Sequence, residues 1–169
     1  MYGCKPVDIP LVVNKKLKKE DGGSLVDASM YRSLVGSLFY LTDSRIDLMF
    51  ASSLLSRFMS KPSHLHLGEA KRSLRYVMGT MEHGIRSEKN SKLEAKGYCD
   101  SDWVRSVDDM KSTSDYVFNL GSGVISWCSK KKDIMAQSST EAEYLAAGLA
   151  TQQSLWLRRI LEDIREKQE

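Results

Sequence analysis

The sequence predicts an α+β protein, in which a helical N-terminal segment precedes an incomplete layer of three antiparallel strands with one or two helices. Two observations carry this prediction. Apolar residues recur at helical spacing through the first half of the chain, and the period then falls to about two before helical spacing returns near the C-terminus. With 169 residues, the chain is long enough for one domain with a core, or for a small domain with a helical extension.

Three regions follow from these changes of period. Residues 1–24 contain two prolines, a lysine run and "EDGGS", so we expect an irregular N-terminal segment. Residues 25–82 carry the helical pattern, and residues 83–169 carry the strands and the last helical stretch. No internal repeat is present.

The helical region is divided by its own capping residues. Asp27 is the expected N-cap of a first helix, and a second apolar stripe over residues 46–58 is ended by Pro62. Ser63 is the expected N-cap of a third helix, which stops near Gly79.

The strand region has its own turn chemistry. The run "NLGSGVIS" puts Gly121, Ser122 and Gly123 between two β-rich segments, which predicts a hairpin. The helix after it should be capped by Ser139 or Thr140 and continue to the end of the chain. Glu141 and Glu143 then lie in its first turn, where negative charge suits the helix dipole.

Bulk properties exclude few classes of protein. The net charge of +3 does not indicate nucleic-acid binding, although the lysine runs at 14–19 and 129–133 are either local phosphate-facing patches or solvated loops. The cysteines Cys4, Cys99 and Cys128 lack zinc-ligand spacing, which favours free thiols. No stretch is apolar enough to span a membrane, and the N-terminus is a poor secretory signal.

Acidic residues mark the one candidate for a metal site. Asp100 and Asp102 in "GYCDSDW" share one face of a strand, because side chains alternate with period two. Glu143, or Glu141, begins the helix that follows the hairpin. A magnesium site of the two-ion type needs carboxylates from several elements. The alternative is that these residues serve capping and solubility.

At this point the residues resemble a known family. The segment "YRSLVGSLFYLTDSRIDLMF" and its continuation to residue 85 is similar to the segment that joins reverse transcriptase to ribonuclease H in copia-type retrotransposon polyproteins. "GYCDSDW" and "SSTEAEY", with the hairpin between them, resemble that ribonuclease H. The resemblance implies a five-stranded sheet flanked by helices, and two-metal cleavage of RNA in RNA–DNA hybrids. It makes Asp100 the first-strand metal ligand and Glu143, in "AEY", the helix ligand.

The sequence departs from the family pattern in ways that put the activity in doubt. The further strands and the acids they carry in the family do not occur before "EDIREKQE", so residues 83–169 are expected to form a truncated ribonuclease-H-like domain. Two carboxylates hold metal far less well than four, so no cofactor or stable metal is expected, although the ancestral enzyme uses Mg²⁺. The strand of Asp100 becomes an open edge, available for association. Arg105 and Asp115 also replace family residues near the site.

A second resemblance concerns the tetrapeptide Arg72, Ser73, Leu74 and Arg75. It matches the Arg-x-Leu-Arg motif of secreted oomycete effectors, and the whole chain resembles copia-derived effectors of this kind. On a helix, Arg72 and Arg75 are otherwise a solvated face.

The effector resemblance implies that the protein is secreted and acts in the cytoplasm or nucleus of a plant host cell. There it would bind a host protein and suppress defence or cell death, and no membrane partner is expected. Without it, an intracellular protein is expected. The enzymatic alternative is a ribonuclease H completed by a partner, and a third alternative is a fragment without a selected role.

Overall fold

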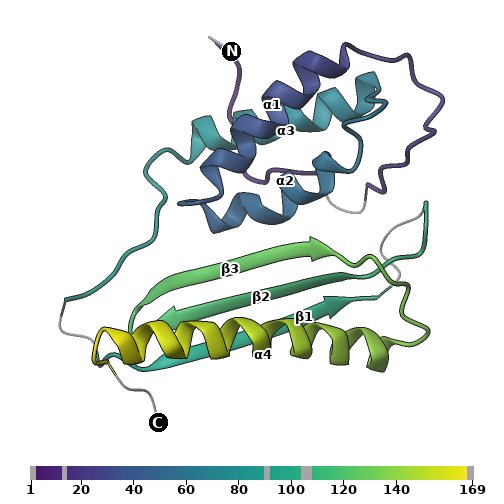
Figure 1. The fold of residues 1–169 in the computed structure, drawn as a ribbon. Coiled ribbons are helices and arrows are strands. Elements are labelled where there is room, and N and C mark those ends of the chain that lie inside the picture. The colour runs from purple at the N-terminus through teal and green to yellow at the C-terminus, as the bar shows by residue number, and fades with distance from the viewer. Residues whose placement is uncertain (1–2, 13–14, 90–91, 104–107, 167–169) are drawn as a thin grey trace. The chain divides into compact units, whose positions relative to one another are not determined.

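The chain folds into two compact units, which are described separately. The computed structural model describes residues 3–12, 15–89, 92–103 and 108–166. Unit 1 comprises Met1–Gly84 and unit 2 comprises Ile85–Glu169 (Figure 1). In the described residues, helices both precede and follow an antiparallel sheet from which they are separate along the chain, so the predicted α+β class is confirmed.

Unit 1 contains the helical region. Its elements are α1 (Ala28–Leu41), a short 3₁₀ turn η1 (Ile46–Leu48), α2 (Met49–Ser56) and α3 (His64–Gly79). Asp27 caps α1 by accepting a hydrogen bond from the Ser29 amide, and Ser63 caps α3 by accepting one from the His66 amide, as predicted. The stop at Gly79 is also confirmed.

The apolar faces of these helices form one core. Tyr31, which is fully buried, donates a hydrogen bond from its hydroxyl to the Leu55 carbonyl at 2.9 Å. The bond satisfies the one polar group that this ring carries into the core, and burial raises the pKa of Tyr31. The other buried members of the cluster are Val35, Leu38, Leu55, Phe58, Leu67 and Ala70.

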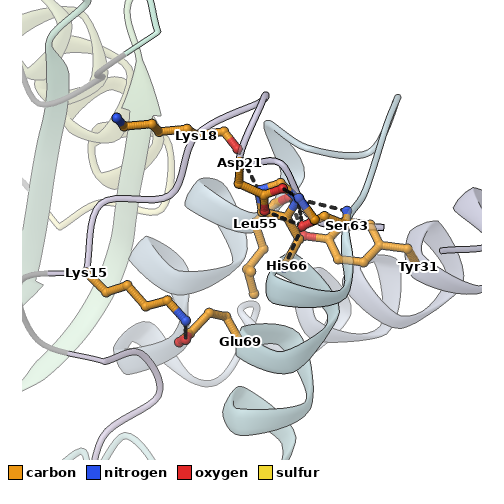
Figure 2. Close-up of polar contacts among 9 residues, drawn as sticks. Lys15, Lys18, Asp21, Tyr31, Leu55, Ser63, His66 and Glu69 are labelled. Atoms are coloured by element: carbon orange, nitrogen blue, oxygen red, sulfur yellow. Dashed lines mark hydrogen bonds and ion pairs between the residues drawn. The ribbon is translucent and has the colours of Figure 1, made fainter. Parts of the chain in front are cut away.

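The N-terminal segment is irregular, as predicted, but it is attached along the whole length of α3. We call residues 6–12 and 15–24 the strap. It runs antiparallel to α3 and makes most of its contacts through polar groups, several of them drawn in Figure 2. From the C-terminal to the N-terminal end of α3, the contacts are Pro6 at Gly79, Pro10 at Ser73, Val12 and Lys15 at Glu69, Lys18 at His66, Asp21 at Ser63 and Ser24 at His64.

His66 is the central residue of this attachment. It is fully buried, and its ring stacks on Phe58 with a centroid distance of 4.0 Å. The Ser63 amide donates to Nδ1 at 3.0 Å, so the ring proton lies on Nε2, which donates to the Lys18 carbonyl at 3.0 Å. One neutral imidazole therefore caps α3 and holds the strap.

Unit 2 contains the strands and the last helix. Its described residues form a three-stranded antiparallel sheet in the order β1 (Ala95–Asp102), β2 (Thr113–Leu120) and β3 (Gly123–Lys131). The predicted hairpin is confirmed, with Gly121 at a φ of +60° between β2 and β3. The helix α4 (Ser139–Asp163) packs along β1 and β2 (Figure 1).

The predicted ends of α4 were wrong at both termini. The N-cap is Ser138, not Ser139 or Thr140, because Ser138 has extended backbone angles and its hydroxyl accepts from the Glu141 amide at 3.1 Å. The Glu141 carboxylate also accepts from the amide of Gln137, the residue before the N-cap, at 2.7 Å. The helix ends at Asp163, before the expected point.

The attachment of the strap predicts the effect of removing Glu69. This buried carboxylate accepts hydrogen bonds from the Lys15 ammonium at 2.7 Å and from the Val12 amide at 3.2 Å. Glu69→Ala should lower the free energy of unfolding by about 1–3 kcal/mol, because both donors lose their acceptor. Urea titration measures the loss, and limited proteolysis should show earlier cleavage within residues 3–20. Glu82→Ala, at an exposed position, is the matched control; equal protease resistance of the two variants would contradict the strap contacts.

Asp21 predicts a pH dependence. The Ser63 hydroxyl, and after it the Gly23 amide, hold the pKa of Asp21 below its usual value of 3.8. A carboxyl with a lowered pKa in the folded state contributes stability above its unfolded pKa, and that contribution is lost as the pH falls through the folded value. Urea titrations should show wild type more stable than Asp21→Asn at pH 6, with the difference shrinking below about pH 4. Asp43→Asn controls for net charge, and a constant difference would refute the assignment.

Candidate functional site

The candidate metal ligand Asp100 lies near the C-terminal end of β1. Its side chain is exposed, and Oδ1 accepts a hydrogen bond from the neighbouring Ser101 amide at 2.8 Å. Register places Asp100 directly opposite Asp115 of β2, the residue that departs from the family pattern. Directly opposed residues share one face of a sheet, so the Asp100 and Asp115 carboxylates lie on the same face.

Two side-chain contacts show which face of the sheet α4 covers. Gln153 donates to the Ser126 hydroxyl at 3.1 Å, and the Lys132 ammonium donates to the Leu145 carbonyl at 3.1 Å. Ser126 is paired with Phe118, and Phe118 with Gly97, where a Cβ would fall 2.4 Å from the Phe118 ring. These residues therefore belong to the face under α4.

Alternation assigns Asp100 to the other face. Asp100 is three residues beyond Gly97 on the same strand, and an odd number of steps changes the face. Glu143 is exposed to solvent and lies on α4, on the α4 side of the sheet, but only Glu141 is in the first turn of that helix, so the expectation that both glutamates lie there was wrong for Glu143. The two expected ligands therefore come from opposite sides of the sheet plane.

Metal binding needs more ligands than these two. Among the residues that the structure describes, no three His, Cys, Asp or Glu side chains are grouped closely enough to hold a metal ion. Arg105, the other departure near the site, lies outside the described residues. In the same part of the chain, no helix is long and apolar enough to cross a bilayer. All three cysteines are free thiols.

The tetrapeptide of residues 72–75 lies in the middle of α3. Ser73 is fully buried and donates from its hydroxyl to the Pro10 carbonyl of the strap at 3.0 Å. Leu74 packs against the core cluster, and Arg72 and Arg75 are half-buried. In this fold the tetrapeptide is part of a helix interface rather than an extended, accessible motif.

The residues that sequence reasoning missed are His66 and Glu69. Both lie on the buried side of α3 and hold the strap. One signal was available, because Ser63 and His66 have the three-residue spacing of a reciprocal helix cap. Nothing in the sequence indicated the long-range partners Lys18 and Lys15.

Comparison with known proteins gives relatives but no solved fold. No family model and no solved structure matches the chain. It is 40% identical over 164 residues to the retrovirus-related Pol polyprotein from transposon RE1 of Arabidopsis thaliana, and 36% identical over 172 residues to that from transposon TNT 1-94 of Nicotiana tabacum. These matches cover 97% of this chain but only 11% and 13% of the polyproteins, so the chain spans about a tenth of their length.

A shorter relative is matched over most of its own length. The chain is 42% identical over 128 residues to secreted RxLR effector protein 161 of Plasmopara viticola. The match covers 75% of this chain and 90% of that protein.

The opposition of Asp100 and Asp115 predicts a stabilising substitution. Asp100→Asn keeps the acceptor for the Ser101 amide and removes one of two like charges, so the free energy of unfolding should rise by about 0.2–1 kcal/mol at pH 7. Thermal or urea unfolding at low ionic strength measures the gain. Asp102→Asn is the matched control, because its paired residue is the uncharged Thr113. A gain in the control and none at Asp100 would contradict the register.

Proposed function

Because this chain belongs to the family of copia-type retrotransposon Pol proteins, we propose that it is a non-catalytic descendant of that family which acts as a secreted effector of the RxLR type. In this proposal it binds a host protein in the cytoplasm or nucleus of a plant cell and suppresses defence or cell death. The observation that carries the effector role is the match to nine-tenths of a named secreted effector.

The geometry of unit 2 supports the non-catalytic part. Asp100 belongs to the face of the sheet opposite α4, which carries Glu143, and Asp100 faces Asp115 across the β1–β2 ladder. Two carboxylates from opposite sides of a sheet do not converge on one ion, and a third carboxylate paired with one of them adds repulsion without completing the set. Binding, rather than hydrolysis, is the mode of action that suits this arrangement.

The buried position of Ser73 makes the tetrapeptide of residues 72–75 a poor target for a functional test. Ser73 is buried against the strap, so substitution within residues 72–75 would disturb unit 1 as well as any motif. The proposal therefore depends on the whole-chain match and not on these four residues, and they are unsuitable as a functional test.

The test expresses the chain inside plant leaf cells together with a cell-death elicitor. We expect reduced cell death, and an equal reduction by the double variant Asp100→Ala/Glu143→Ala, because both residues are exposed and neither is needed for binding in this proposal. Immunoblotting confirms that the two proteins accumulate equally. Cell death that proceeds unchanged beside accumulated wild-type protein would refute the effector role.

A second assay separates binding from catalysis. The purified chain is incubated with an RNA–DNA hybrid and Mg²⁺, and we expect no cleavage above that of the double variant. Metal-dependent cleavage by wild type that is lost in Asp100→Ala would overturn the non-catalytic proposal and favour a ribonuclease H.

A further inference from the structure

We draw no further inference here: the strongest candidate, the exposed apolar surface patch that Leu155, Trp156 and Ile160 form on the second half of α4, is an unpartnered helix face, and nothing in the described part of the structure shows what covers it.

Discussion

The pairing register of β1 against β2 determines which side chains of unit 2 can act together. Gly97 lies opposite Phe118, and the Phe118 ring occupies the space where a side chain at Gly97 would lie, on the face of the sheet that α4 covers. The same register sets Asp100 opposite Asp115 on the other face. A slip of one residue in β1 would move Asp100 and Asp102 to the other face, so the faces on which these carboxylates lie depend on this pairing.

A polar constraint has the same importance in unit 1. The strap packs Leu11 and Leu17 against the core cluster, and polar groups buried on α3 also hold it: His66, Ser73 and Glu69. Each of these would be costly to leave without a hydrogen bond, so the strap and the buried face of α3 require each other. An irregular segment is thereby fixed by polar complementarity rather than by a core of its own.

The comparison with relatives identifies the family of this chain, whereas the arrangement of its acidic side chains is seen only in its own structure. The chain is 40% identical over 164 residues to a Pol polyprotein from a transposon. The position of β1 as the first strand of the described sheet and the opposition of Asp100 and Asp115 are observations on the structure of unit 2.

The sequence by itself determined the elements that local physics controls: the caps at Asp27 and Ser63, the stop at Gly79, and the hairpin at Gly121, each set by residues within one turn. It misplaced the start of α4, because "QSSTE" offers several hydroxyls and the backbone angles at Ser138 decide among them. Only the tertiary structure decided the faces of the sheet and the attachment of the strap. The faces depend on register, and the attachment depends on side-chain partners 42 to 63 residues away, as with His66 and Lys18 at a separation of 48, which no local pattern encodes.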